Sequence, residues 1–230
     1  MIKHLACIMD GNRRWAHKNG LPSMLGHKEG IKAVERTADF CLKNNIPYLS
    51  LYTFSIENLK RSISEKQYIF GLLVSYFTDH EIQKFIKKDV RIVFIGDRSL
   101  FPADIIDTCT HIEKETAQGK KLTINLLFCY GARQEITDAV KKIAYAVQQG
   151  MVSPEHITEQ LIASHLWLTN IPDPELIIRT GGGQRLSNFL LYHAAYSELY
   201  FTDTLWPDFT QAHLLDALNY LNTCQRNFGV

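Results

Sequence analysis

The sequence has no excess of charge of either sign. Its 25 lysine and arginine residues face 24 aspartate and glutamate residues, so the net charge is +1 with histidine neutral. Proteins that bind nucleic acid through a global electrostatic field usually carry a clear excess of basic residues. We therefore expect no nucleic-acid partner, and any anion binding must come from local clusters of basic side chains.

Paired cysteines are also absent. None of the five cysteines forms a C-x-x-C pair, and their number is odd. This excludes a disulfide framework and a zinc-ribbon type of site, and it indicates reduced thiols in a cytoplasmic protein. The cysteines are Cys7, Cys41, Cys109, Cys129 and Cys224.

Long hydrophobic runs are missing as well. No apolar stretch approaches the roughly 20 residues that a membrane span requires. The first residues, Met1-Ile2-Lys3-His4, lead directly into an expected strand without the pattern of a signal peptide. We expect a soluble cytoplasmic protein, and peripheral contact with the inner surface of the membrane stays open as an alternative.

Short apolar runs alternate with longer amphipathic ones along the whole chain. This alternation is typical of a parallel sheet covered by helices. It predicts one α/β domain over residues 1–230, an open, mostly parallel, six-stranded sheet flanked by about seven helices. The expected strands are Leu5–Met9, Tyr48–Thr53, Val90–Ile95, Leu122–Cys129, Glu175–Arg179 and Leu199–Phe201. The expected helices are Gly30–Asn44, Glu65–Lys88, Pro102–Ala117, Gln134–Gln149, Thr158–Leu166, Asn188–Tyr196 and Gln211–Cys224.

The expected helix Glu65–Lys88 has a broad apolar stripe that includes Tyr68, Leu72 and Tyr76. A stripe at helical spacing predicts a face that packs against the core. The wall of an elongated apolar tunnel would have the same pattern, so both interpretations remain open at this point.

Three polar motifs follow three of the expected strands. The first, Asp10 to Ala16, combines a carboxylate, a glycine and two arginines behind Leu5–Met9. Arginine matches phosphate oxygens, glycine allows close approach to the main chain, and aspartate can bind a hard divalent cation. His27, shortly after this motif, is a further candidate phosphate donor. Because ligands of open α/β sheets bind beyond the carboxyl ends of strands, this motif predicts a phosphate site.

The second motif, Thr53 to Arg61, places the short polar side chains of Ser55, Glu57 and Asn58 next to the apolar Phe54. Such a combination is typical of a reacting centre beside an apolar substrate. The third, Arg179 to Asn188, contains three successive glycines and two arginines, and we expect it to open a helix and cradle phosphate. It is not a P-loop, because the G-x-x-x-x-G-K-[ST] spacing is missing. Glu198, at the start of the last apolar run, is either an edge-strand surface residue or a partner of Asp10 in a Mg²⁺ site.

These motifs together resemble the cis-prenyltransferase family, in particular the bacterial undecaprenyl diphosphate synthases. The resemblance runs in collinear order over essentially the whole chain. The matching segments are MDGNRRWA (residues 9–16), GHKEG (26–30), TFSIEN (53–58) with Arg61 and Glu65 behind it, PDPELIIRTGG (172–182), RLSNFLL (185–191), AYSELYF (195–201) and LWPDF (205–209).

The resemblance implies repeated head-to-tail condensation of isopentenyl diphosphate onto an allylic diphosphate, usually farnesyl diphosphate, with cis double bonds. The product would be a long polyprenyl diphosphate such as the C55 lipid-carrier precursor of the cell wall. It also implies Mg²⁺ as cofactor, a homodimer, and an apolar tunnel for the growing chain. Asp10 and Asn58 would be catalytic, and Asp10 and Glu198 would hold the metal. The implied substrate-binding residues are Gly11, Asn12, Arg13, Arg14, Trp15, Ser23, His27, Ser55, Ile56, Glu57, Leu59, Arg61, Arg179, Arg185, Leu186 and Ser187.

Several positions depart from the pattern of the family. Ser23 stands where arginine is common, Leu59 where tryptophan is frequent, and Gly183 where glutamate is frequent. The tail reads Arg226-Asn227-Phe228-Gly229 where two arginines are usual. We expect weaker diphosphate binding from these changes, without loss of catalysis. Near the far end of the tunnel we expect Leu122, with Ile124 as the alternative if the register is shifted.

Other classes of protein fit less well. Trans-prenyltransferases are all-helical and carry a DD-x-x-D motif, which this chain lacks. A nucleotide-binding or phosphatase domain would need a P-loop or a nucleophile motif. The remaining alternative is an inactive partner subunit of a heteromeric prenyltransferase, but such subunits typically lose the carboxylate that Asp10 supplies.

Overall fold

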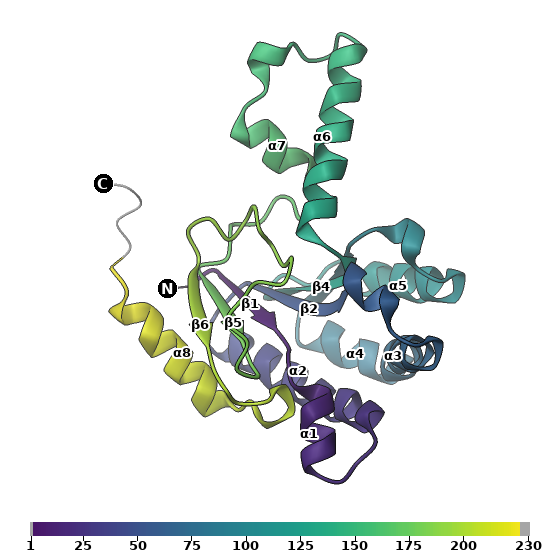
Figure 1. Cartoon of the computed structure of the whole chain (residues 1–230), viewed down its shortest axis with the longest axis vertical. Helices are drawn as coiled ribbons and strands as arrows, with labels where there is room; N and C mark the ends of the chain where they lie inside the picture. Colours follow the sequence, from purple (N-terminus) through teal and green to yellow (C-terminus); the bar gives the residue numbers. More distant parts are fainter. Residues whose placement is uncertain (1, 226–230) are drawn as a thin grey trace.

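Six parallel strands form one sheet in the computed structural model, which describes residues 2–225 (Figure 1). The sheet order is β3-β4-β2-β1-β5-β6, and every neighbouring pair in this sheet is parallel. The α/β class and all six expected strands are confirmed. The strands are β1 His4–Ile8, β2 Tyr48–Ser55, β3 Val90–Ile95, β4 Leu122–Tyr130, β5 Leu176–Arg179 and β6 Glu198–Phe201.

Eight α-helices lie between and after the strands of the described chain. They are α1 Asn12–Lys18, α2 Ser23–Lys43, α3 Ile63–Tyr76, α4 Asp79–Lys87, α5 Ala103–Glu115, α6 Ala132–Gln148, α7 Glu159–His165 and α8 Gln211–Thr223. Four short 3₁₀ turns are also present: η1 Ile56–Lys60, η2 Arg98–Leu100, η3 Pro154–His156 and η4 Trp206–Asp208.

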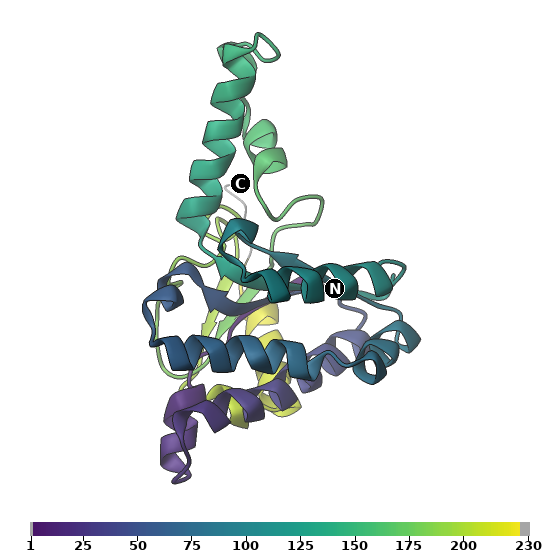
Figure 2. The same cartoon turned by 90° about the vertical axis from the view of Figure 1, so that its right-hand side faces the viewer.

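Alternate strand residues enter two separate hydrophobic cores, one on each face of the sheet. Leu5 and Cys7 of β1 belong to the larger core, which helices α2, α4, α5 and α8 complete. Ala6 and Ile8 belong to the smaller core, which is closed by the start of α6 and by loop residues such as Phe189. Most helices therefore cover one face, while α6 and α7 rise from the other as a projecting arm (Figures 1 and 2).

Two predicted helices differ from the structure. The segment Asn188–Tyr196, expected to be helical, is a series of turns in which Asn188 and Leu190 have φ angles of 66° and 45°. The predicted helix Glu65–Lys88 is two helices, because Thr78 caps α4 by accepting a hydrogen bond from the Glu81 N–H (3.3 Å). Neither break contains a proline that would have marked it in the sequence.

Helix α1 was not predicted, and α2 begins at Ser23, seven residues before the predicted start at Gly30. The two helices pack closely where Gly26 meets Asn12. A Cβ atom at position 26 would lie 1.9 Å from the main-chain oxygen of Asn12. Gly26 is therefore a point of close contact between the two helices.

The predicted tunnel wall is helix α3. It has no fully buried residue, yet Ile69, Phe70 and Leu73 pack against the larger core. Leu122 and Ile124 of β4 are buried in that core (0% and 2% exposed). These positions are compatible with a chain-binding space between α3 and the sheet, and the tunnel stays a prediction.

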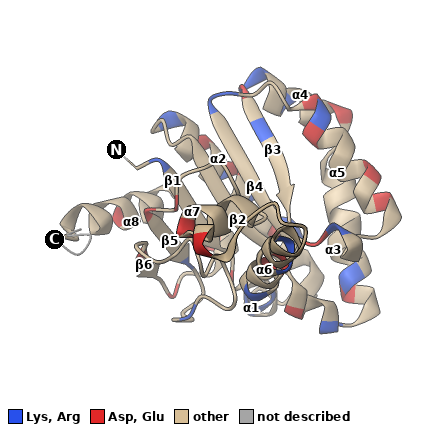
Figure 3. Cartoon of the chain, turned by 90° about the horizontal axis from the view of Figure 1, so that it is seen from above, with Lys and Arg blue, Asp and Glu red and all other residues tan. Residues whose placement is uncertain are grey.

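No helix within residues 2–225 is long and apolar enough to cross a membrane. Seen from above, α4 carries both acidic and basic residues, and α5 carries four acidic residues and one lysine (Figure 3). This mixture agrees with the expectation that anion binding must be local.

A buried polar chain crosses the smaller core near the amino ends of the strands. Asn125 donates to the hydroxyl of Ser50 (3.2 Å), which lies 2.8 Å from Nε2 of His4. The other ring nitrogen of His4 lies 2.7 Å from the carbonyl oxygen of Pro172. A neutral imidazole satisfies both contacts, because one nitrogen accepts and the other donates. Burial lowers the pKa of His4 from its usual 6.5 to about 4.

We expect His4 to make folding sensitive to acid. A histidine whose pKa is lower in the folded state binds its proton mainly after unfolding, so stability falls as the pH drops from 6.5 toward 4. The loss from this group is about 3 kcal/mol at 1.36 kcal/mol per pKa unit. Urea unfolding measures the free energy of unfolding at pH 7 and pH 4. Between these two pH values, His4→Gln should lose less of this free energy than the wild type, by the same amount. His111→Gln, on an exposed face of α5, is the control. Parallel pH profiles for the wild type and His4→Gln would contradict the assignment.

Candidate active site

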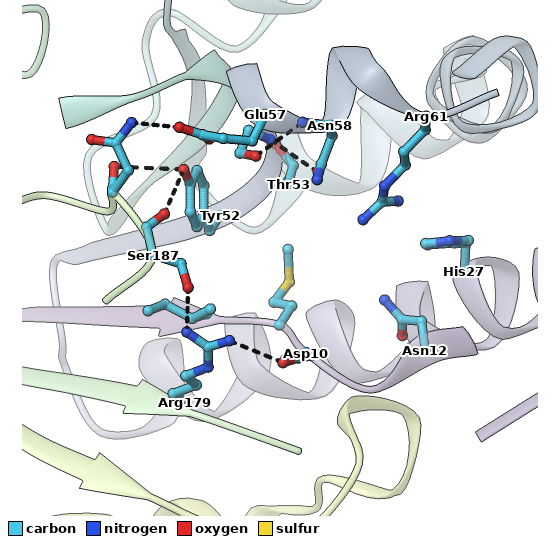
Figure 4. Close-up of a pocket in the computed structure, with 14 residues that line it drawn as sticks. Asp10, Asn12, His27, Tyr52, Thr53, Glu57, Asn58, Arg61, Arg179 and Ser187 are labelled. Atoms are coloured by element: carbon cyan, nitrogen blue, oxygen red, sulfur yellow. Dashed lines mark hydrogen bonds and ion pairs between the residues drawn. The ribbon is translucent and has the colours of Figure 1, made fainter. Parts of the chain in front are cut away.

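The carboxyl ends of β1, β2 and β5 open into one cavity of about 570 Å³ (Figure 4). Ile8, the last residue of β1, and Met9, which follows it, form an apolar side of the cavity. The remaining lining residues are mostly polar. Nine of the residues expected from the sequence lie in its wall: Asp10, Asn12, His27, Ser55, Glu57, Asn58, Arg61, Arg179 and Ser187.

Asp10 is fixed by its main chain as well as its side chain. Its carbonyl oxygen accepts hydrogen bonds from the Thr180 hydroxyl (2.7 Å) and the Trp206 N–H (3.1 Å). Its carboxylate accepts from Arg14 through Oδ1 (3.0 Å) and from Arg179 through Oδ2 (3.1 Å). The carboxylate therefore stands between two guanidinium groups at the mouth of the sheet.

Arg179, the last residue of β5, is held from several sides. Its side chain is only 5% exposed, and Nη1 donates to the Ser187 hydroxyl (2.7 Å) and to the carbonyl oxygen of Arg185. The loop that follows is irregular, so the prediction that the third motif opens a helix is wrong. The polar groups of this motif are placed by contacts with the buried Arg179 and not by a helix N-terminus.

The loop also explains why position 183 is a glycine in this chain. A Cβ atom there would lie 2.8 Å from Nε of Arg179. Any side chain at this position would therefore require the guanidinium to shift.

A second cavity of about 370 Å³ adjoins the first on the side of α1. It is lined by five arginine or histidine side chains, three of which lie near Glu65. Oε1 of Glu65 lies 3.1 Å from Arg61, 3.9 Å from Arg13 and 3.9 Å from His27. One carboxylate thus partly neutralises a group of basic side chains that surround an anion-sized space.

His27 faces both cavities and is held in its neutral form. Burial, and next the Arg61 guanidinium, lower the pKa of His27 to about 4. Nε2 of His27 is buried and has no hydrogen-bond partner among the described residues. A neutral imidazole with a free ring nitrogen can donate a hydrogen bond to a phosphate oxygen.

The end of β2 is shaped by a capping box. The Ser55 hydroxyl accepts from the Asn58 N–H and the Asn58 side chain accepts from the Ser55 N–H, both at 3.2 Å. The contacts orient the Asn58 side chain into the cavity, opposite Asn12 and His27 (Figure 4). Ser55 and Asn58 therefore act as one rigid unit.

Seven residues expected in the site line neither of these two cavities. Trp15 donates from Nε1 to Asp208 (2.7 Å), and the Ser23 hydroxyl lies 2.7 Å from Nε2 of His17. The remaining five residues contribute to the surrounding loops or to the sheet, and they are Ile56, Leu59, Arg185, Leu186 and Glu198.

Glu198 is separated from Asp10 by the register of the sheet. Glu198 pairs with Leu176, and Leu176 pairs with Leu5, so Glu198 lies at the amino ends of the strands. Asp10 follows five residues after Leu5, which corresponds to about 16 Å along the strand direction. Within one chain these two carboxylates do not form a shared metal site.

A divalent cation can still be held at Asp10. Residues 2–225 contain no group of three or more acidic, histidine or cysteine side chains arranged for a metal. Magnesium, however, is commonly bound by one or two carboxylates together with substrate phosphates. The Asp10 carboxylate, 33% exposed beside the cavity, fits that mode of binding.

Tyr52 and Asn188 line the larger cavity and were not among the expected site residues. Glu65, which belongs to the segments that match the family, was given no role, and it lies close to the basic residues of the smaller cavity. The spacing Ser62-x-x-Glu65 is a helix-start pattern that could have drawn attention to Glu65, since Ser62 caps α3 by accepting from the Glu65 N–H (3.3 Å). Asn188 was predicted to begin a helix, whereas it lies in a turn, where its side chain contacts Glu57 and Arg133.

Comparisons with known proteins agree with this arrangement. Residues 8–229 match the family model described as "Putative undecaprenyl diphosphate synthase". The chain is 43% identical over 229 residues to an isoprenyl transferase of Geobacillus kaustophilus, covering all of this chain and 89% of that protein. It is 41% identical over 228 residues to a farnesyl-diphosphate-specific ditrans,polycis-undecaprenyl-diphosphate synthase of Xanthomonas axonopodis, covering 99% of this chain and 88% of that protein.

Two solved structures share the whole fold. Lavandulyl diphosphate synthase from Lavandula x intermedia, in complex with dimethylallyl diphosphate, matches with a TM-score of 0.95 at 32% identity, over 100% of this chain and 98% of that one. A probable undecaprenyl diphosphate synthase from Campylobacter jejuni matches with a TM-score of 0.82 at 34% identity, over 100% and 99%. The matching motifs, the sheet and these full-length similarities lead to one conclusion: the chain belongs to the undecaprenyl diphosphate synthase family of cis-prenyltransferases.

Proposed function

We propose that this enzyme condenses isopentenyl diphosphate repeatedly onto an allylic diphosphate, with farnesyl diphosphate as the starter and a long-chain polyprenyl diphosphate, such as the C55 lipid-carrier precursor, as the product. The observation that carries the proposal is the pair of adjoining cavities, in which guanidinium groups from three separate segments converge on anion-sized space. Arg14 and Arg179 contact the carboxylate of Asp10, and Arg61 contacts Glu65 beside it.

Each half of the site would hold one diphosphate. The smaller cavity, with Arg13, Arg14, His27 and the main chain after Gly11, suits the allylic diphosphate. The larger cavity, with Arg179 and Ser187 on one side, suits isopentenyl diphosphate, and we propose that Arg185 and Leu186 complete that side. Two diphosphates side by side concentrate negative charge, which several fixed guanidinium groups can stabilise.

The reaction breaks the bond between the allylic C1 carbon and its diphosphate oxygen. C4 of isopentenyl diphosphate bonds to that carbon, and a proton leaves C2. Negative charge builds up on the departing diphosphate, where preorganised donors are most effective. We propose that the unit of Ser55 and Asn58, with Glu57 beside it, lies where the proton leaves, since it faces the cavity from the opposite side to Asp10.

We further propose that Mg²⁺ is the cofactor and that Asp10 holds it together with substrate phosphates. Bound there, the ion would neutralise charge on the leaving diphosphate. A contribution of Glu198 to the same ion would have to come from a second chain, because the register separates the two carboxylates within one chain.

A homodimer in the cytoplasm, with transient contact to the membrane surface for product release, completes the proposal. The aromatic residues around Ala195–Phe209 and the tail are one candidate interface, but Trp206 and Phe209 are buried within the chain itself (1% exposed each). The tail from residue 226 lies outside the described residues. The arm offers a better surface, because Tyr145 of α6 is 62% exposed and Met151 after it is 75% exposed.

A second candidate is a shorter product made from a smaller starter. The neighbour with the TM-score of 0.95 is named for lavandulyl diphosphate and was solved with dimethylallyl diphosphate. In this chain, Phe70 of α3 packs against Phe54 and Phe128 of the sheet, with ring centroids 5.1 and 5.3 Å apart. These rings occupy space directly behind the cavity. Incubation with radiolabelled isopentenyl diphosphate and either starter, followed by sizing of the products, distinguishes the two candidates.

We expect Asp10→Asn to lower kcat by about 10²-fold or more, because it removes a charge that acts on the departing diphosphate. The melting temperature should also fall, because the buried Arg179 guanidinium loses its compensating charge, so kcat is compared at a temperature at which both proteins are folded. Steady-state kinetics at saturating Mg²⁺ measure the effect, and Asp107→Asn on the exposed face of α5 is the matched control. Near-normal kcat would remove Asp10 from the mechanism.

Product length should depend on Phe70. If the growing chain runs between α3 and the sheet, Phe70→Ala removes the ring that α3 contributes to the cluster, and the main product should become longer. Leu122→Ala should have the same effect when the chain reaches the amino ends of the strands. If Leu122 only packs the core, its truncation lowers stability by about 2–5 kcal/mol and leaves thin-layer product profiles unchanged.

Light scattering at micromolar concentration should give a particle of twice the 26.4 kDa chain mass. Tyr145→Glu should shift that mass toward the monomer, because it places a charge in an apolar interface. Ile86→Glu, at a partly exposed apolar position of α4, is the control and should leave the dimer intact. A fully active monomer would contradict the proposed assembly.

A further inference from the structure

The side chain of Asn188 connects three segments that are far apart in the sequence. Its Nδ2 donates to Oε1 of Glu57 (2.8 Å) and to Oε1 of Gln134 (3.0 Å). Its Oδ1 accepts from the N–H of Arg133 (2.8 Å), and its carbonyl oxygen accepts from the N–H of Ala132 (2.9 Å). One residue thus joins η1, the first turn of α6 and the loop after β5.

The backbone around Asn188 is in an unusual conformation. Ser187, Asn188 and Leu190 have φ angles of 50°, 66° and 45°, in the left-handed region that non-glycine residues seldom adopt. Asparagine tolerates this region better than most residues. Phe189 between them stacks on Tyr52 with ring centroids 4.8 Å apart. This conformation is the one in which the Ser187 hydroxyl meets Arg179.

Gly131 leaves room for the same amide. A Cβ atom at position 131 would lie 2.6 Å from Nδ2 of Asn188 and 2.4 Å from Oε1 of Gln134. A side chain at position 131 would therefore collide with both partners of the hydrogen bond between Asn188 and Gln134.

We propose that Asn188 is a positioning residue that fixes Glu57 and Ser187 relative to each other. These two pocket residues come from separate segments, η1 and the loop after β5, which Tyr52 of β2 also links, because its hydroxyl donates to the Ser187 carbonyl oxygen (3.3 Å). The inference rests on the proposed function, because it assigns Asn188 to the placement of the groups that receive isopentenyl diphosphate.

A simpler role for Asn188 would be to cap α6 alone. Asn188→Asp separates the two roles. Aspartate keeps the oxygen that accepts from Arg133 N–H and also suits the left-handed conformation, so a pure cap is preserved. It replaces the donor that faces Glu57 with a second carboxylate oxygen. The amide of Gln134 can rotate to donate to that oxygen, whereas Glu57 cannot.

A double-mutant cycle with Glu57→Gln tests the proposal. In the wild-type background, Asn188→Asp should lower kcat/KM for isopentenyl diphosphate about tenfold, mainly through KM, with little change in melting temperature. In the Glu57→Gln background, the new glutamine amide can donate to the carboxylate at position 188, and the same change should cost less than about twofold. Gly131→Ala, which displaces the amide sterically, should reproduce the rise in KM.

Equal losses in both backgrounds, or no loss from Asn188→Asp in the wild type, would overturn the proposal. The same four proteins are titrated calorimetrically with inorganic diphosphate, and affinity should show the same coupling. A wild-type protein that makes no prenyl product contradicts the proposed function, while an additive cycle in an active enzyme contradicts only the role of Asn188. If the wild type is inactive, coupled diphosphate affinities support the positioning role and additive ones overturn it.

Discussion

The contact between the Asp10 carboxylate and two guanidinium groups holds the site together. Arg179 is almost completely buried at the end of β5, and an unpaired buried charge would be costly. Asp10 supplies the compensating charge, while its main-chain oxygen anchors Thr180 and Trp206 from two later segments. The arginines are thus in place before a substrate arrives, so little reorganisation is needed when diphosphate charge develops.

The parallel sheet determines which residues can share this site. All strands point the same way, so groups that follow β1, β2 and β5 meet at one edge, and groups that precede strands meet at the other. Asp10 and Arg179 therefore come together across about 170 residues, whereas Glu198 is placed at the opposite edge. Any joint action of Glu198 with Asp10 depends on assembly with another chain.

The sequence predicted the strands and the motif residues well, because buried parallel strands are continuous apolar runs and their polar ends follow directly in the sequence. It missed helix α1, whose polar residues show no apolar stripe. It wrongly predicted a helix at Asn188–Tyr196, where apolar residues at helical spacing pack against the smaller core in turns. The contacts of Glu65 and Asn188 could not be predicted, since their partners include residues dozens of positions away.

The neutral state of His27 decides how the site responds to pH. Burial and the Arg61 guanidinium keep the pKa of His27 near 4, so its charge does not change around neutral pH. The positive charge available to diphosphate then comes from arginines, which stay protonated over the same range. Glu65 holds Arg61 within this group and limits repulsion among the basic side chains. Around neutral pH the charge of the cavities is therefore set by arginine and carboxylate side chains, while the neutral His27 ring keeps a buried nitrogen without a partner among the described residues.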